Sequence, residues 1–457
     1  MWTRFFLLSL LAAPPAAAAP AASEAVAATA PLLHLSGNIR ARVESIDNQV
    51  RPGLRRDEDL FVLRTVLRAE LGNGPLRFVT EIWDSRAYGS GSSLAGGRSA
   101  VSNGEVNVFE PVQVHVAADL GDVLGTGTAL HVTAGRMMLN LGSRRLVAAD
   151  DYRNTTAGST GLRVDFRPRP GIETSLIYVL PQQRLPNAPA AVQSNDFAFD
   201  RESFDLQLWG GVASFDRALG ASSVDFGAFR LVERDGPGRP TRDRHLTTIA
   251  MRVLRPPAAG HADHDIEAAW QWGQVRNGLL GTAERQQVAA WFVHAEAGYS
   301  PMLAGHLRLA VELDGISGDR PGGRYTRFDT LFGMRRADFS PGSILSVIGR
   351  ANMLAAGLRL EAAPSPRTDA FVSARALWAE SGRDVFSQSG VIDTSGASGR
   401  FAGYELDSRL RHWLVPARLR AEIDGVVLLR RGLLRTAPNA PAGASTLYAS
   451  ASLTAYF

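Results

Sequence analysis

Apolar and polar residues alternate along several long stretches of the chain. In residues 33–44 the odd positions are apolar or glycine, whereas the even positions are polar and include Arg40, Arg42 and Glu44. The same alternation recurs elsewhere, most clearly in residues 61–71, 162–167, 305–315, 401–411 and 417–430. A period of two predicts β-strands with one apolar face and one charged face. The fold class is therefore all-β.

The connections between these segments alternate in length. Short turns are expected at residues 72–75, 121–127, 169–170, 217–221, 256–263, 301–304 and 362–367 and at Pro416. Long loops are expected at residues 46–58, 87–105, 137–160, 181–202, 317–344, 381–399 and 431–444, with two shorter ones at 234–241 and 277–285. A single strand of this kind also suits a soluble antiparallel sheet. The alternating loop lengths are typical of a transmembrane antiparallel β-barrel with short periplasmic turns and long extracellular loops, here of about 18 strands.

The two ends of the chain support an outer-membrane location. Residues 1–22 contain one arginine, a short apolar run and small residues, which predicts a cleaved signal peptide. Residues 23–32 would then be a short periplasmic segment, and residues 33–457 a single barrel. The last strand alternates up to Phe457, and a terminal aromatic residue resembles the assembly signal of outer-membrane barrels. The periplasmic segment is too short to be the plug of an energy-coupled transporter, so we expect passive transport.

Composition narrows the chemistry further. The chain has no cysteine, so neither a disulfide nor a thiolate metal site can form. All 49 basic residues are arginine, and they are nearly balanced by 45 acidic ones. Codon bias accounts for this usage, but arginine is also the better group for bidentate carboxylate recognition. The spacing of His261, His264 and Asp265 resembles that of metal ligands but falls at an expected turn. We expect no metal, no cofactor, no nucleic acid partner and no enzymatic activity.

Two stretches of the sequence resemble the alginate export family of outer-membrane proteins. The first is residues 135–147, GRMMLNLGSRRLV, which continues through DDYRNT at 150–155. The second is SGDRP at 317–321, followed by RFDTLFG at 327–333. Weaker similarities are DSR at 84–86 and GYELD at 403–407. The resemblance implies a monomeric barrel of eighteen strands whose arginine-rich conduit passes an anionic polysaccharide. Met137 and Met138 stand where many relatives carry a polar pair, so contacts with the substrate could differ here.

A conduit for a polyuronate needs many weak sites that attract carboxylates along the lumen. Guanidinium groups provide this attraction, and neighbouring carboxylates orient them and moderate their affinity. The predicted cationic lining is Arg40, Arg42, Arg64, Arg68, Arg86, Arg136, Arg144, Arg145, Arg409 and Arg420. The predicted orienting residues are Glu70, Asp84, Asn140, Asp150, Glu405 and Asp407. The alternative for each residue is that its ion pairs only brace the wall of a wide barrel.

Three functions fit this sequence to different degrees. The first is a passive channel for an anionic, alginate-like polysaccharide, anion-selective and surrounded by outer-membrane lipid. The second is a general or uptake porin for small acidic solutes or oligosaccharides on the same scaffold. The third, more remote, is a barrel hydrolase, although no catalytic motif is present. Whether the direction is export or import, and which periplasmic partners take part, does not follow from the sequence.

Overall fold

The computed structural model describes residues 32–89, 97–236, 238–303, 305–336 and 338–457. The expected signal peptide and nearly all of the short segment after it lie outside these residues. Within them, no helix combines the length and the apolar character needed to span a membrane.

Strands make up almost all of the regular structure in the described part of the chain. They are β1 (Leu33–Asp47), β2 (Glu58–Leu71), β3 (Leu76–Tyr88), β4 (Asn107–Gly121), β5 (Ala129–Met137), β6 (Ser159–Arg169), β7 (Ile172–Pro181), β8 (Leu206–Leu219), β9 (Ser222–Glu233), β10 (His245–Arg255), β11 (Ala262–Arg276), β12 (Arg285–Tyr299), β13 (Arg308–Ile316), β14 (Arg324–Tyr325), β15 (Met353–Ser365), β16 (Thr368–Trp378), β17 (Phe401–Val415), β18 (Leu419–Arg430) and β19 (Ser445–Tyr456). Two short helices, α1 (Pro189–Gln193) and α2 (Gly432–Thr436), lie in loops.

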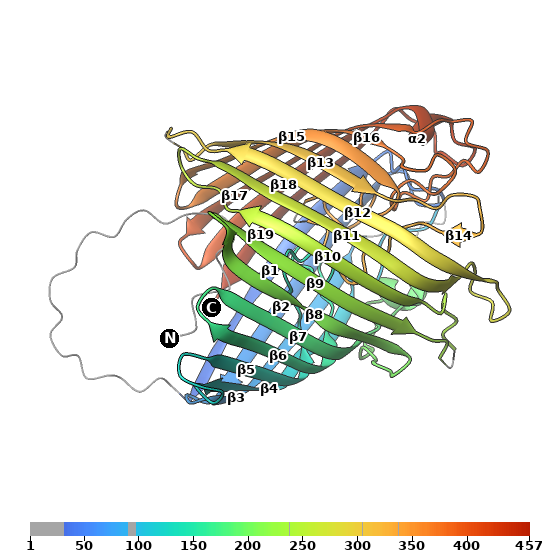
Figure 1. Cartoon of the computed structure of the whole chain (residues 1–457). Coiled ribbons are helices and arrows are strands. Elements are labelled where there is room, and N and C mark those ends of the chain that lie inside the picture. Colours follow the sequence, from blue (N-terminus) through green and yellow to red (C-terminus); the bar gives the residue numbers. More distant parts are fainter. Residues whose placement is uncertain (1–31, 90–96, 237, 304, 337) are drawn as a thin grey trace.

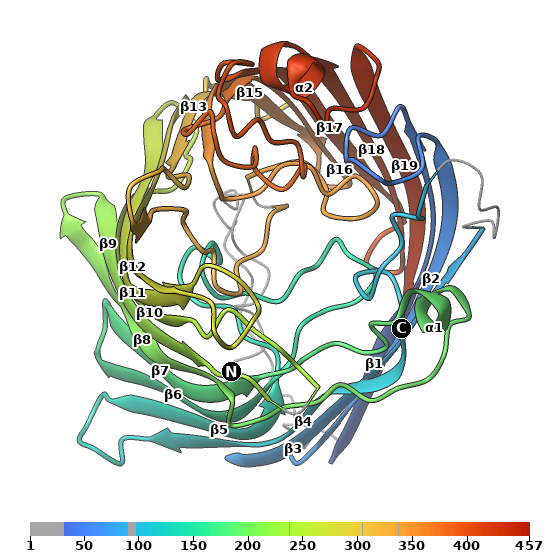
Figure 2. The same cartoon turned by 90° about the vertical axis from the view of Figure 1, so that its right-hand side faces the viewer.

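The long strands form one closed antiparallel barrel (Figures 1 and 2). Each strand pairs with its sequence neighbours, and the barrel closes where β1 pairs with β19 from Asn38–Tyr456 to Asp47–Leu447. The two-residue β14 instead pairs in parallel with β12 and belongs to a loop. The wall therefore has eighteen strands, which confirms the predicted fold class. We call the two rims the short-turn end and the long-loop end.

The two faces of the wall carry the residues that the alternation predicts. In β1, Ile39 and Val43 are 44% and 54% exposed, whereas Arg40 and Arg42 are only 7% and 2% exposed. Outward apolar side chains meet hydrocarbon, and inward charged side chains lie in the lumen. Two strand starts differ slightly from the prediction. β13 begins at Arg308 rather than at 305, and β18 begins at Leu419 because Ala417 adopts a left-handed turn conformation with φ 59°.

Two long loops do not project outward as expected but fold into the barrel. They are residues 138–158, between β5 and β6, and residues 317–352, between β13 and β15, and Figure 2 shows loop segments crossing the lumen. Phe339, Ile344 and Val347 of the second loop are fully buried in one apolar cluster with wall residues such as Leu231 and Phe292. The physical reason is burial of apolar area. These loops carry large apolar side chains, and the strands present apolar residues on their inward faces near the long-loop end.

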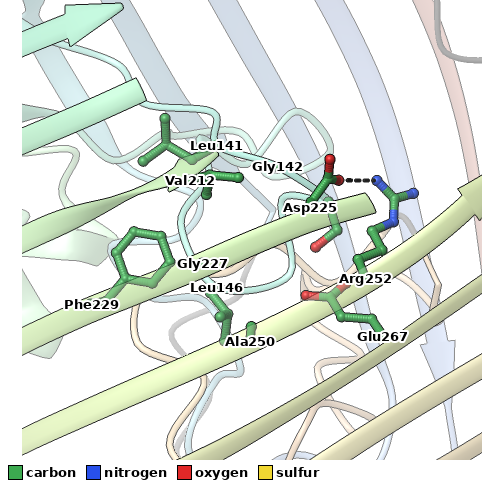
Figure 3. A pocket seen from close by; sticks show the side chains of 11 residues that line it. Leu141, Gly142, Leu146, Val212, Asp225, Gly227, Phe229, Ala250, Arg252 and Glu267 are labelled. Carbon is green, nitrogen blue, oxygen red and sulfur yellow. Dashed lines mark ion pairs between the residues drawn. The ribbon is translucent and has the colours of Figure 1, made fainter. Parts of the chain in front are cut away.

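The contact between the first inward loop and the wall is close. Leu141, Gly142 and Leu146 of the loop face Val212 and Phe229 of the wall across a cavity of about 20 Å³ (Figure 3). That volume holds roughly one water molecule. At this contact the loop therefore packs directly against the wall with little space between them.

The direction of the faces can be tested with one pair of substitutions. Leu406 lies on the outward face of β17, and Leu406→Arg should lower the free energy of unfolding by about 2–4 kcal/mol, because arginine is costly against hydrocarbon. Val123 is exposed in the turn after β4, outside the strands, so Val123→Arg should cost at most about 1 kcal/mol. Urea unfolding in lipid vesicles measures both, and equal costs would contradict the assigned faces.

Candidate functional site

Arg145 fixes the first inward loop at the centre of a buried group of carboxylates. Its guanidinium donates to both oxygens of Asp338 at 2.9 Å, to Glu267 at 2.8 Å and to Asp265 at 3.0 Å. Asp338 belongs to the second loop, whereas Asp265 and Glu267 belong to β11. Burial would lower the pKa of Arg145, but these three carboxylates outweigh it and raise that pKa well above its ordinary value. One side chain thus ties both loops to the wall.

The backbones of the two inward loops also pair with each other. Val147 and Phe332 form a parallel bridge, in which Ala148 N donates to Phe332 O at 3.0 Å and Phe332 N donates to Leu146 O at 2.9 Å. Gly333 allows this approach, because a β-carbon there would lie 1.8 Å from Arg145 O. The two stretches on which the family resemblance rests therefore contact each other inside the barrel.

Residues 150–156 of the first loop lie across β1 and β2 and are held there by arginines. Arg40 donates to Arg153 O at 2.8 Å, and Arg42 donates to Tyr152 O at 2.6 Å. Arg64 donates to Arg153 O at 3.3 Å, and its guanidinium stacks 4.5 Å from the Trp83 ring. These three predicted lining residues do point inward, but they bind loop carbonyls.

The second loop brings in arginines that the sequence pattern did not single out. Arg336 pairs with Asp407 at 2.7 Å and also with Asp424, and Arg350 pairs with Asp338. Arg375 of β16 pairs with Glu312 at 3.0 Å and with Glu405 at 3.3 Å. Glu405 and Asp407 therefore pair with arginines that lie outside the predicted lining. The Arg335-Arg336 pair directly after the RFDTLFG stretch was the signal that could have identified Arg336.

Five inward arginines near the short-turn end form a second group, which we call the arginine belt: Arg40, Arg64, Arg409, Arg411 and Arg420. Strand register places Arg64 beside Arg40, Arg40 beside Thr454, and Thr454 beside Arg420. Among the residues that the structure describes, only Asp369 and Glu422 pair with belt members, at 2.8 Å from Arg411 and 3.6 Å from Arg420. The Nε atoms of Arg40, Arg64, Arg409 and Arg420 are buried without a hydrogen-bond partner in the described structure. The belt thus has more guanidinium than carboxylate.

Other predicted residues lie in smaller groups. Arg68 points inward and pairs with Glu70 at 3.2 Å and Glu81 at 3.4 Å. Arg136 is at the long-loop end and pairs with Glu110 at 2.6 Å and Glu202 at 2.9 Å.

Within the first loop, Arg144 Nε donates to Asn140 Oδ1 at 2.9 Å, and the Arg144 guanidinium also pairs with Asp151 at 2.9 Å. Asp150 accepts from the backbone of Tyr152 and Arg153. These contacts shape the loop itself.

Asp84 and Arg86 are a correction to the predicted lining. They pair with each other at 2.9 Å, but the buried, inward positions of β3 are Val79, Glu81, Trp83, Ser85 and Ala87. Asp84 and Arg86 therefore lie on the outward face of β3, and we exclude them from the conduit. Their polarity misled the assignment, because a paired Asp and Arg near a strand end can also face outward.

Charge is unevenly distributed around the lumen. The arginine belt lies on β1, β2, β17 and β18. The strands β11, β12 and β13 follow one another along another part of the wall, in which β11 and β12 lie across the barrel from β1 and β2 in Figure 2. Those three strands carry inward carboxylates at Asp263, Asp265, Glu267, Glu296, Glu312 and Asp314. His264 of β11 points the other way, toward Ser222, so it does not join Asp265 in a metal site. Each of these inward carboxylates is paired with an inward basic residue such as Arg145, Arg308 or Arg375, so their negative charge is largely neutralised.

Removal of Arg145 should loosen the inward loops. Arg145→Ala leaves three buried carboxylates without their shared partner, a loss of about 3–5 kcal/mol in loop anchoring. Arg144→Ala is the matched control, because Arg144 is partly exposed and its ion pair is worth at most about 1 kcal/mol. Hydrogen exchange of residues 138–149 should accelerate, and single-channel conductance should rise, only in Arg145→Ala. The same behaviour in both variants would mean that Arg145 does not anchor the loops.

Acid should release the loops only well below neutral pH. Burial would raise the pKa of Asp338, but Arg145 and Arg350 outweigh it and hold that pKa well below its ordinary value. The anchoring is therefore complete above the unfolded pKa of about 4 and is lost as pH falls through the lower folded pKa. His294, which also faces this group, gains positive charge in acid and favours retention of the anchoring. Conductance should stay constant from pH 7 to 5 and rise below pH 4, whereas a rise near pH 6 would contradict this coupling.

Comparisons with known proteins agree with this geometry. A family model described as Alginate export matches residues 32–440. By structure, the chain is similar to Pseudomonas aeruginosa OccK9 (OpdG), with a TM-score of 0.58 and 12% identity over 93% of this chain and 98% of that chain. It is similar also to OpdQ from the same organism, with a TM-score of 0.57 and 11% identity over 93% of this chain and 97% of that chain. A third similar structure is Pseudomonas aeruginosa OccK2 (OpdF) in complex with glucuronate, with a TM-score of 0.55 and 12% identity over 93% of this chain and 98% of that chain. No curated protein matches the chain by sequence. The chain belongs to the alginate export family, and it is a β-barrel channel of the outer membrane.

Proposed function

We propose that this channel passively conducts an anionic glycan whose sugars carry carboxylates, such as an alginate-like polyuronate. The observation that carries the proposal is the arginine belt, in which five inward guanidiniums have only two paired carboxylates. Aromatic rings orient these arginines: the Arg409 guanidinium lies 5.0 Å from Phe371, and that of Arg420 lies 5.6 Å from Trp413. Such preoriented guanidiniums bind carboxylates without a large loss of side-chain freedom.

A second candidate is a porin for small acidic solutes or short acidic oligosaccharides. It is favoured by the inward loops, since Phe339 and Ile344 pack apolar side chains against the wall inside the barrel. A narrow passage suits a short solute better than a long polymer. The similar structure of OccK2 (OpdF) is a complex with glucuronate, a single acidic sugar, and that observation belongs to OccK2.

Planar bilayers test both candidates. The wild-type channel should prefer chloride to potassium, and Arg409→Gln with Arg420→Gln should shift the reversal potential toward that of an unselective pore. Arg169→Gln with Arg217→Gln, at the exposed short-turn ends of β6 and β8, removes the same two charges near the rim and should change little. An unchanged reversal potential in the double variant would contradict the role of the belt.

Uronate oligosaccharides of increasing length then separate the two substrates. Current block and passage that persist for long oligomers support the polymer conduit, whereas a cut-off at one or two sugars supports the small-solute porin. Neutral oligosaccharides of equal length are the control for size alone. A large conductance that no uronate affects would contradict both candidates.

A further inference from the structure

Five arginines from five different loops meet at the long-loop end, outside the arginine belt. We call them the loop arginines: Arg51, Arg98, Arg153, Arg184 and Arg335. They come from the loops that follow β1, β3, β5, β7 and β13. Burial lowers the pKa of Arg51, Arg184 and Arg335, and Arg153 lies close enough to each of these three side chains to lower that pKa further. None of them belongs to the predicted lining.

Hydrogen bonds between the loops hold this group in place. Arg98 N donates to Gly53 O at 3.0 Å, which joins the loop after β3 to the loop after β1. Asn103 Nδ2 donates to Arg184 O at 3.0 Å, and the Arg184 guanidinium donates to Thr155 Oγ1 at 3.0 Å. Hydrogen bonds between neighbouring loops thus fix the positions of the loop arginines.

Three carboxylates lie near the loop arginines, and all are already engaged. Asp200 accepts from Asn107 at 2.7 Å and from the backbone of Leu185 at 2.8 Å. Glu105 accepts from the backbone N and the hydroxyl of Ser102 at 2.8 and 2.9 Å. Asp150 accepts from two backbone N–H groups of its own loop and pairs only with Arg153, at 3.4 Å. Within the described residues, Arg51, Arg184 and Arg335 form no ion pair. Positive charge is therefore in excess.

Gly342 marks the space between two of these guanidiniums. A β-carbon on Gly342 would lie 3.2 Å from Arg153 Nε and 3.6 Å from Arg335 Nη1. Arg335 Nη1 is buried and has no hydrogen-bond partner in the described structure. Burial and then the nearby Arg153 lower the pKa of Arg335 to about 9. Two like charges around a small space, one with an unused buried donor, are unfavourable unless an anion lies between them.

We propose that Arg153, Arg184 and Arg335, with Arg51 and Arg98 beside them, form a carboxylate-binding site at the long-loop end of the channel. The site would take the carboxylate of an acidic sugar before that sugar enters the lumen, so it rests on the proposed function. Guanidinium groups bind carboxylates in bidentate fashion, which suits the unused donor of Arg335. Arg98 is exposed and Arg153 is partly exposed, so the site is accessible from outside.

Trigalacturonate tests this site in two ways. Titration calorimetry of the detergent-solubilised barrel measures its affinity, and single-channel recordings with the sugar added on one side at a time measure side-specific block. Wild-type channels should be blocked at lower concentration from the long-loop end. Arg153→Gln with Arg335→Gln should weaken binding at least tenfold and abolish the difference between the two sides. Arg217→Gln, at the exposed short-turn end of β8, is the matched control and should leave both unchanged.

Gly342→Ala provides a second variant that keeps every charge. Its methyl group occupies the space between Arg153 and Arg335, so it should weaken trigalacturonate binding without a change in reversal potential. Heat-modified migration on gels establishes that each variant is a folded barrel.

The outcomes separate this site from the proposed function. Wild-type-like affinity and block in the folded double variant, with uronate still conducted, would overturn the loop-arginine site alone. A wild-type channel that neither prefers anions nor responds to uronates would overturn the proposed function as well.

Discussion

The pairing of β1 with β19 is the constraint on which the rest of the structure depends. In hydrocarbon, every backbone N–H and C=O must be satisfied within the protein, and only a closed barrel achieves this with strands. Closure fixes which side chains face lipid, because successive residues of a strand point to opposite faces. Arg40 and Arg42 can then be buried only in the lumen, where other polar groups must satisfy them.

The inward loops follow from that requirement. Buried arginines are tolerated when carboxylates or carbonyls surround them. Arg42 pairs with Glu44 and donates to the Tyr152 carbonyl, and Arg145 pairs with three carboxylates. The inward loops thus provide hydrogen-bond partners for buried arginines of the wall, and carboxylates of the wall bind Arg145 of the first loop. The arginine belt differs, because most of its Nε atoms remain unpartnered in the described structure and its paired carboxylates are few, although Arg40 and Arg64 also donate to a loop carbonyl.

The sequence predicted the barrel well because period-two alternation and alternating loop lengths are local signals. It predicted the site less well, for reasons visible in particular residues. Leu231 and Phe292 are apolar yet point inward near the long-loop end, because the inward loops cover them there. The expectation that inward residues are polar therefore fails at these positions. Asp84 and Arg86 are polar yet face outward. Arg336 reaches Asp407 only because a loop of more than thirty residues folds back into the lumen, and no local pattern encodes that path.

The position of the family-like stretches bears on how tightly the fold constrains its residues. Both main stretches lie mostly in the inward loops, which pair through Val147 and Phe332, although the first begins in the last residues of β5. The eighteen-strand wall needs only alternation and turns, which many sequences provide, as the 12% identity to OccK9 (OpdG) illustrates. The loops need particular residues, such as Gly333 against the Arg145 carbonyl. The fold therefore constrains the loop residues more tightly than most wall residues, because the loops depend on specific buried contacts while the wall depends on alternation and turns.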